Sequence, residues 1–410
     1  MNIIVFTFIG FFIILLNYKR VELFLVILCA YFVKLALVFT QRFVRPVFSS
    51  SDQVNFLNTA VEWSSLEFIE LLGKFDPTQS YVISWVSALI FYFFGHEVVL
   101  VNILMSWIGL GTIIVAYKFS YSMSEDKRVA VLVSLLVAII PSLSIINAAL
   151  LRESFVIYFV ILSFYYAFLW WNSLSIKYAL LCVFSVVVSG FFHGALYFLV
   201  PFFAFIFLIR VVRSRYSQNK KFIYYSLFFV SLIPVFLFGY TMKDNVKVEM
   251  AVSMLSGEQR SIERLSLVEL SGEGINSIAY PSVGGGFAEK TLLAPIRMAF
   301  FSYTPALWHF SKITDVPRII DSILFVFFLM VAILVFIKNF RDPRFSYYCW
   351  FVFPVVLFLI LMFSFGSFDV GTGQRHRLKF LSVVVVVYGS MFFSLFRKYN
   401  FYGFRRIRLL

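Results

Sequence analysis

Two long apolar stretches determine the architecture predicted for this chain: residues 147–171 (NAALLRESFVIYFVILSFYYAFLWW) and residues 178–203 (YALLCVFSVVVSGFFHGALYFLVPFF). A helix that crosses a membrane needs about 20 predominantly apolar residues, and each stretch is long enough to supply one. Arg152, Glu153 and His193 interrupt the two stretches, although ionisable groups are costly close to hydrocarbon. We therefore expect membrane-spanning helices here, with these three polar residues gathered on one side of the membrane.

The whole chain shares this apolar character. Of its 410 residues, 61% are hydrophobic and 14% are charged, and the mean hydropathy is +0.91. A soluble domain is closer to half apolar and a quarter charged. The composition therefore predicts an all-α, polytopic integral membrane protein with about 11 transmembrane helices. The expected spans are residues 1–16, 21–40, 99–117, 129–148, 154–171, 178–192, 195–212, 222–240, 319–337, 346–365 and 378–396.

The basic charge of the chain is better explained by membrane topology than by nucleic-acid binding. The formal net charge is +14, but Lys and Arg lie in short runs between apolar stretches, and no recognition module accompanies them. Cys29, Cys182 and Cys349 lack metal-ligand spacing, and no nucleotide, zinc or Ser-His-Asp motif is recognisable. We expect no nucleic-acid partner, no metal site and no cofactor, with a divalent cation left open.

Residues 81–95, YVISWVSALIFYFFG, determine the predicted topology of everything after them. If they spanned the membrane, the later basic runs would lie on the side opposite Lys19 and Arg20. As a juxtamembrane or re-entrant helix, they place every strong basic run on one side, which the positive-inside rule assigns to the cytoplasm. We adopt this second interpretation. We also expect an uncleaved first span with its N-terminus outside, because no basic residue precedes it.

The predicted topology divides the chain into three regions. They are an N-terminal transmembrane module (1–240) with an external loop (41–98), a long extracytoplasmic loop (241–318), and a C-terminal transmembrane module (319–410) with a cytoplasmic basic tail. Within the long loop, residues 246–274 have the pattern of an amphipathic interfacial helix. Three glycines at 284–286 suit a hinge.

Candidate catalytic residues fall on the expected external face. Asp52 opens an amphipathic helical pattern, where it can act as a general base, help to hold a cation, or simply cap the helix. Arg152 and Glu153 form either a functional pair or an ion pair that satisfies a helix N-terminus. His193 can exchange a proton near neutral pH or serve a structural role.

The last expected external loop is residues 366–377, which lie within the basic segment GSFDVGTGQRHRLKF at 366–380. Arg375, His376, Arg377 and Lys379 follow a glycine-rich turn in this segment. Such a cluster suits a phosphate or pyrophosphate ligand, and contact with anionic lipid headgroups is the alternative. Residues 292–310 are expected to form a lip over the same cavity through Arg297, Trp308 and His309.

Four short elements together resemble a known family. They are Leu-Leu-Arg-Glu at 150–153, the histidine of FFHGAL at 191–196, Asp52 with Phe56 four residues later, and the glycine-then-Arg-x-Arg element at 371–377. Across most of its length the chain resembles the bacterial O-antigen and exopolysaccharide repeat-unit polymerases of the Wzy/EpsG type. This resemblance implies an enzyme that joins undecaprenyl-pyrophosphate-linked oligosaccharides on the periplasmic face. It also implies that arginines of the external loops act in the reaction, here Arg152, Arg375 and Arg377.

The outline is also similar to the GT-C membrane glycosyltransferases, such as the protein mannosyltransferases and aminoarabinose transferases. That similarity implies a catalytic acidic residue in the first external loop, here Asp52, and a juxtamembrane helix, here 81–95. The chain departs from the pattern of that group in one respect. Gln53 follows Asp52 and the next carboxylate is Glu62, whereas a second acidic residue usually lies nearby.

These observations lead to one expected function. We expect a glycosyltransferase of the bacterial inner (plasma) membrane that polymerises polyprenyl-pyrophosphate-linked repeat units on the external face, for O-antigen, capsule or exopolysaccharide synthesis. The expected catalytic residues are Asp52, Glu153 and His193, and the expected pyrophosphate-binding residues are Arg152, Arg297, Arg375 and Arg377. The expected partners are the lipid-linked glycan and membrane lipid, with a chain-length regulator as an optional one.

Two alternative functions remain open. The first is a GT-C transferase that moves a single sugar from a polyprenyl-phosphate donor. The second is a transporter or flippase of the same lipid-linked sugar, which needs polar groups along a path through the bilayer. Mid-span positions are almost free of charged residues, which argues against transport.

Overall fold

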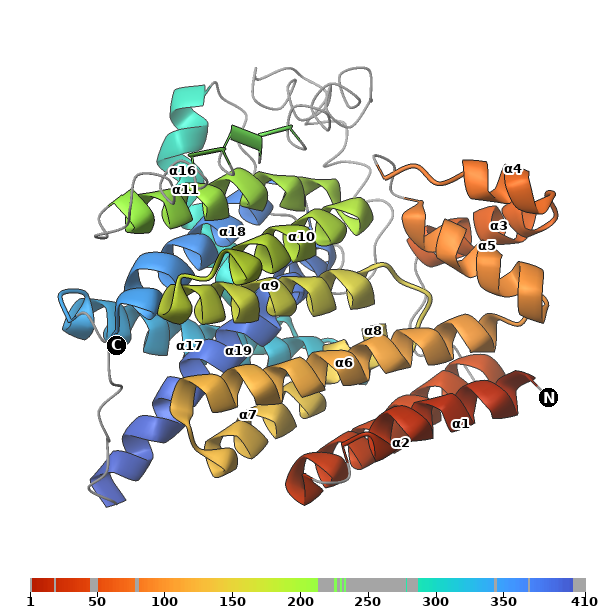
Figure 1. The fold of residues 1–410 in the computed structure, drawn as a ribbon, viewed down its shortest axis with the longest axis horizontal. Coiled ribbons are helices and arrows are strands. Elements are labelled where there is room, and N and C mark those ends of the chain that lie inside the picture. The colour runs from red at the N-terminus through yellow and green to blue at the C-terminus, as the bar shows by residue number, and fades with distance from the viewer. Residues whose placement is uncertain are drawn as a thin grey trace.

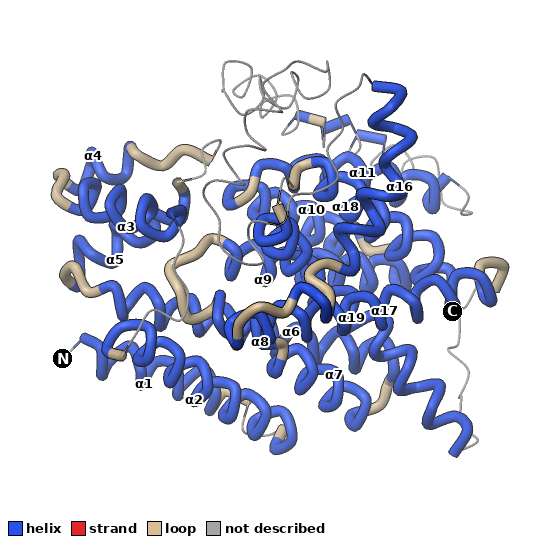
Figure 2. Tube along the Cα trace, turned by 180° about the vertical axis from the view of Figure 1, so that it is seen from behind, coloured by secondary structure: helices blue, strands red, loops and turns tan. Residues whose placement is uncertain are grey.

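The computed structural model describes residues 2–17, 20–44, 51–77, 81–212, 225–226, 229–230, 232–233, 278, 287–342, 345–367 and 369–400 (Figure 1). Every regular element in these residues is a helix, and Figure 2 shows no strand among them. The expected all-α class is confirmed for this part of the chain.

The longer helices, in chain order, are α1 (Asn2–Leu15), α2 (Val21–Phe43), α3 (Ser51–Ser64), α4 (Phe68–Gly73), α5 (Val82–Phe94), α6 (Val98–Ser124), α7 (Lys127–Ile139), α8 (Pro141–Ile146), α9 (Glu153–Ser173), α10 (Ile176–Phe192), α11 (Leu199–Val212), α16 (Phe287–Tyr303), α17 (Val316–Asn339), α18 (Phe353–Phe365) and α19 (Val370–Asn400). Short helical turns precede several of them: η1 (Gly194–Phe198), η3 (Leu307–His309), η4 (Ile313–Asp315) and η6 (Tyr348–Val352).

Within the described residues, seven helical segments are long and apolar enough to cross a membrane. They are Val21–Phe43, Val98–Ser124, Glu153–Ser173, Gly194–Val212, Ile313–Asn339, Tyr348–Phe365 and Val370–Ser394. This agrees with an α-helical membrane protein, but the expected count of about 11 spans is not confirmed. Several expected spans are shorter helices, such as α1 and α10, and a 14-residue helix rises only about 21 Å. Most of the expected span 222–240 lies outside the described residues.

The expected span 129–148 is not one continuous helix. α7 ends at Ile139, and Pro141 begins the separate short helix α8. Proline cannot donate the backbone hydrogen bond of a helix interior, and its ring disfavours helical geometry in the residue before it. Ile140 accordingly has φ −57° and ψ 113°. The prediction was wrong here because hydropathy does not register this break.

The expected external loop at 41–98 folds largely into helices. Residues 51–94 hold α3, α4 and α5, which we call the α3–α5 lobe, and Figure 1 shows these helices grouped together beyond the start of α6. Trp85 donates its indole N–H to the carbonyl oxygen of Leu71 over 2.9 Å, joining α5 to α4. α5 has 13 residues and rises about 20 Å, less than the roughly 30 Å of a hydrocarbon core. Its length agrees with the expected helix that does not span the membrane.

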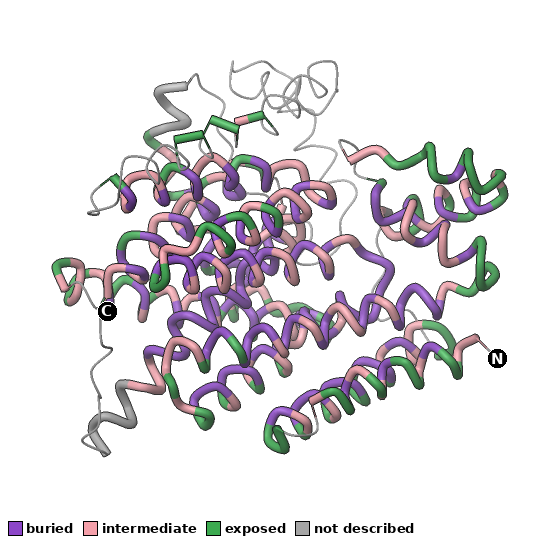
Figure 3. Tube along the Cα trace, viewed as in Figure 1, coloured by how far each residue is buried: buried purple, intermediate pink, exposed green. Residues whose placement is uncertain are grey.

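α19 is the central helix of the bundle. It packs against α6, α7, α9, α17 and α18, and every residue from 377 to 391 is buried (Figure 3). The helix begins at Val370, so the expected flexible loop at 366–377 is wrong for residues 370–377. Asp369 stabilises this start, because its carboxylate accepts hydrogen bonds from the Thr372 backbone N–H at 2.8 Å and the Thr372 hydroxyl at 2.7 Å.

The long loop expected at 241–318 is described only at residue 278 and from residue 287 onward. The described part forms α16, η3 and η4, followed by α17. The expected amphipathic helix at 246–274, the glycine hinge at 284–286 and the end of the basic tail, 401–410, lie outside the described residues.

Candidate functional site

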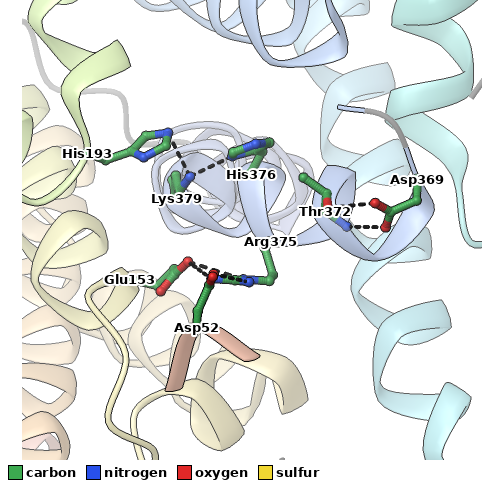
Figure 4. Close-up of polar contacts among 8 residues, drawn as sticks. All are labelled: Asp52, Glu153, His193, Asp369, Thr372, Arg375, His376 and Lys379. Carbon is green, nitrogen blue, oxygen red and sulfur yellow. Dashed lines mark hydrogen bonds and ion pairs between the residues drawn. The ribbon is translucent and has the colours of Figure 1, made fainter. Parts of the chain in front are cut away.

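Four ionisable side chains, each from the end of a different helix, meet in this structure. Glu153 begins α9, His193 follows the last residue of α10, and Arg375 lies near the start of α19. Asp52 lies in the first turn of α3, in the α3–α5 lobe. Figure 4 shows their side chains converging around α19. The sequence placed these residues on one side of the membrane, and the structure brings their side chains into one cluster.

Arg375 links two carboxylates that lie about 100 residues apart in the chain. Its Nη2 and Nε donate to Oε1 of Glu153 over 2.6 Å and 3.2 Å, and its Nη1 lies 2.9 Å from Oδ2 of Asp52. The Glu153 side chain is only 1% exposed, whereas that of Asp52 is 41% exposed. Arg375 therefore compensates a buried carboxylate of the bundle and ties it to the α3–α5 lobe.

Lys379 lies between two imidazoles one helical turn beyond Arg375. Its Nζ is 3.0 Å from Nε2 of His193 and 2.6 Å from Nδ1 of His376. An ammonium group has donors only, so a protonated Lys379 requires both ring nitrogens to accept. Burial lowers the pKa of His193 well below its usual value of 6.5, and the positive charges of Lys379 and Arg152 lower it further. The imidazole of His193 is therefore neutral at pH 7.

Phe363 of α18 supports this group of three side chains. The ring of His376 stacks on it with the centroids 4.7 Å apart, and the ring of His193 stacks at 5.7 Å. The Lys379 Nζ lies 5.0 Å from the centre of the same ring. The phenyl ring thus fixes the orientation of both imidazoles and offers its negative face to the ammonium group.

Arg152 completes the charge of the site. Its guanidinium carbon lies 5.7 Å from the centre of the Phe56 ring of α3. Arg152, Arg375 and Lys379 are three cations, and Asp52 and Glu153 are two carboxylates. With Lys379 protonated and both imidazoles neutral, these described residues carry one net positive charge in a largely buried site. Such a balance suits an anionic ligand, because a buried cation without a counter-charge is costly.

Arg377 does not join this cluster. It lies two residues after Arg375 on a helix, which turns it by about 200° to the opposite face. Its Nη1 donates to the carbonyl oxygens of Phe301, Ser302 and Thr304 at 3.0, 2.9 and 2.8 Å, and its Nη2 donates to the Ser322 hydroxyl at 2.6 Å. The guanidinium therefore caps the C-terminal end of α16, where carbonyl groups lack helical partners.

Arg297 has the same kind of role at another helix end. Its Nη2 donates to the carbonyl oxygens of Ser364 and Ser367 at 2.9 Å each, and so caps the end of α18. The expected lip residues also have local contacts. His309 Nδ1 accepts a hydrogen bond from the Ala306 backbone N–H at 2.9 Å, and the Trp308 ring lies 6.2 Å from that of Tyr303.

Sequence reasoning named Lys379 and His376 as part of a basic segment but gave neither a role, and it missed Phe363. The spacing carried a usable signal. Residues three and four apart lie on one face of a helix, so Arg375, His376 and Lys379 share a face only if residues 370–377 are helical. The assumption of a loop hid this relation.

Neither the metal-ligand geometry nor the comparison with known proteins assigns a function to this site. Among the described residues, no group of three or more His, Cys, Asp or Glu side chains is placed to hold a metal ion. No protein-family model matches the chain, and no curated protein matches its sequence.

Proposed function

We propose that this protein is a membrane glycosyltransferase that polymerises polyprenyl-pyrophosphate-linked oligosaccharide repeats. The observation that carries the proposal is the buried cluster in which Arg375 joins Asp52 and Glu153 beside Lys379 and the two imidazoles. It combines proton acceptors with cations in one place, as transfer of a sugar from a pyrophosphate requires.

The proposed reaction is a displacement at the anomeric carbon. A hydroxyl oxygen of one lipid-linked repeat bonds to the anomeric carbon of the growing chain. The bond from that carbon to the pyrophosphate oxygen breaks, and its electron pair leaves with the polyprenyl pyrophosphate. The hydroxyl proton passes to Asp52, Glu153 or His193.

The cationic side chains of the site have different roles in the proposed reaction. Arg152 and Lys379 make no hydrogen bond to a carboxylate among the described residues, so they are suited to stabilise the charge that develops on the leaving pyrophosphate. Arg375 is committed to two carboxylates and mainly organises the site. Arg297 and Arg377 leave the pyrophosphate-binding set, because both are occupied with helix ends.

The distribution of basic residues supports an external site. Trp171, 18 positions after Glu153 on α9, lies about 27 Å from it along the helix axis. Arg210 donates to the carbonyl oxygen of Trp171 over 2.8 Å, so the end of α11 lies at this opposite end of the bundle. Lys338, in the last turn of α17, belongs to the same basic set. The positive-inside rule then assigns this opposite end to the cytoplasm.

Transport of a lipid-linked sugar is a second candidate function, favoured by one observation. Lys34 of α2 and Asp321 of α17 are 2% and 0% exposed inside candidate spans. Ionisable residues in spans often mark a substrate or ion path, so the near absence of mid-span charge is a weaker argument against transport than the sequence suggested.

Mass spectrometry of lipid-linked glycans from cells lacking this protein tests the proposal. Accumulation of complete single repeats without polymer is the expected result, and the native chain should restore polymer whereas Lys379→Met should not. The matched control is Lys177→Met, at an exposed lysine outside the site. A repeat that lacks one sugar would instead favour a single-sugar transferase. Unchanged glycans would refute both enzyme assignments.

A further inference from the structure

Two buried polar atoms of the site lack hydrogen-bond partners among the described residues. One is Oε2 of Glu153, whose side chain is 1% exposed, and the other is Nε of the neighbouring Arg152. Arg375 occupies only the other carboxylate oxygen, Oε1. Native proteins pair nearly all such buried groups, because an unpaired one loses its water without compensation.

The two unpaired atoms require hydrogen-bond partners of opposite kinds. A carboxylate oxygen only accepts hydrogen bonds, so Glu153 Oε2 requires an O–H or N–H donor. A guanidinium nitrogen only donates, so Arg152 Nε requires an acceptor oxygen, and an anionic oxygen suits it best. The positive charge of Arg152 acts on the Glu153 carboxylate, so the two side chains lie near enough for one ligand to meet both needs.

Two further features favour an anion beside Arg152. The residue occupies the N-cap position of α9 without capping the helix through its side chain. The free N–H groups and positive dipole of a 21-residue helix therefore add to its charge. The ring of Phe56 lies against the guanidinium and fixes its orientation.

We propose that Glu153 Oε2 and Arg152 Nε together recognise a sugar phosphate, with a sugar hydroxyl donating to the carboxylate and a phosphate oxygen accepting from the guanidinium. This assignment rests on the proposed function and narrows its substrate class. It also gives Glu153 a role in sugar recognition that Asp52 and His193 do not share. Asp52 is partly open to solvent, and the Nε2 of His193 already contacts Lys379.

Binding to the full-length protein in phosphatidylcholine nanodiscs tests the inference with three probes. They are a hexose 1-phosphate, glycerol 1-phosphate and inorganic phosphate. We expect the hexose 1-phosphate to bind about tenfold tighter than inorganic phosphate, as one hydrogen bond to a charged group allows. Glycerol 1-phosphate carries the hydroxyl and phosphate chemistry of a lipid headgroup, and its binding at the strength of the hexose 1-phosphate would overturn the sugar assignment.

Glu153→Gln supplies the decisive comparison. Glutamine can still accept from Arg375, but it presents an N–H₂ group where the sugar hydroxyl needs an acceptor. The preference for hexose 1-phosphate over phosphate should fall to within about twofold, whereas the exposed control Glu67→Gln should retain it. A full preference in folded Glu153→Gln protein would overturn the proposal.

Arg152→Lys keeps the test decisive if Glu153→Gln does not fold. It preserves the positive charge but removes Nε, so both phosphates should bind about fivefold more weakly. The control Arg128→Lys, at an exposed position, should bind as the native chain does. Unchanged binding in Arg152→Lys would contradict the proposal, as would the absence of hexose 1-phosphate binding to the native chain. Either result leaves the glycan analysis above as a separate test of polymerisation.

Discussion

Arg375 holds together two carboxylates that differ greatly in burial. Glu153 is almost completely buried, and Asp52 is partly open to solvent. A charge that loses its partner inside a protein is costly, whereas an exposed ion pair contributes little because water screens it. The two contacts of one guanidinium therefore differ in their effect on stability.

Replacing Arg375 should be far more damaging than replacing Asp52. Arg375→Met leaves Glu153 buried without its cation and should lower the free energy of unfolding by about 3–5 kcal/mol. Asp52→Asn should lower it by at most about 1 kcal/mol. Denaturant unfolding of the purified protein in detergent measures both changes. Equal effects of the two substitutions would show that Glu153 does not depend on Arg375.

At the scale of single elements, arginines terminate helices inside the bundle. Arg377 reaches from α19 to the last carbonyl groups of α16, and Arg297 reaches from α16 to the end of α18. Each link satisfies carbonyl groups that a helix leaves unpaired. The two arginines thereby fix α16 and α18 against the helix that carries the site.

Arg377→Met and Arg297→Met should therefore affect stability rather than ligand binding. Each substitution leaves buried carbonyl oxygens without donors and should lower the free energy of unfolding by about 2–3 kcal/mol. Folded variant protein should bind the phosphate probes as the native chain does. Weaker phosphate binding at unchanged stability would return these arginines to the anion site.

At the scale of the whole molecule, the site lies at one end of the bundle. The starts of α9 and α19 and the ends of α10 and α18 meet there, whereas Arg128 near the start of α7 and Arg210 near the end of α11 belong to the opposite, basic end. Membrane insertion tends to retain basic loops in the cytoplasm. The arrangement therefore makes a definite prediction about orientation.

Single cysteines in a background lacking Cys29, Cys182 and Cys349 test this orientation. Glu67→Cys in the α3–α5 lobe should react with a membrane-impermeant maleimide in intact cells. Arg128→Cys should react only after the membrane is opened. Both positions are exposed on the folded protein. The reverse labelling pattern would place the site in the cytoplasm and exclude polymerisation on the external face.

The class of this protein and several of its helices follow from local sequence alone. Apolar runs long enough for a bilayer predict helices, because backbone groups in lipid must pair within their own segment. The predicted Leu-Leu-Arg-Glu turn and the predicted helix at Asp52 are both confirmed. Both were predictable because polar residues mark where an apolar or amphipathic helix begins. Arg152, Glu153, His193 and Arg375 stand out because charge is rare in such a chain.

Which of these polar residues meet depends instead on how the helices pack. Arg375 and Arg377 are indistinguishable in a loop but face opposite ways once α19 begins at Val370, and that start depends on Asp369 and on packing against surrounding helices. Lys379 lies between His193 and His376 only when the end of α10 is brought to α19, which depends on the packing of both helices against α9. Hydropathy reports the cost of leaving water for each residue separately. The pairing of buried charges depends on helix rotation and depth, which only the packed bundle sets.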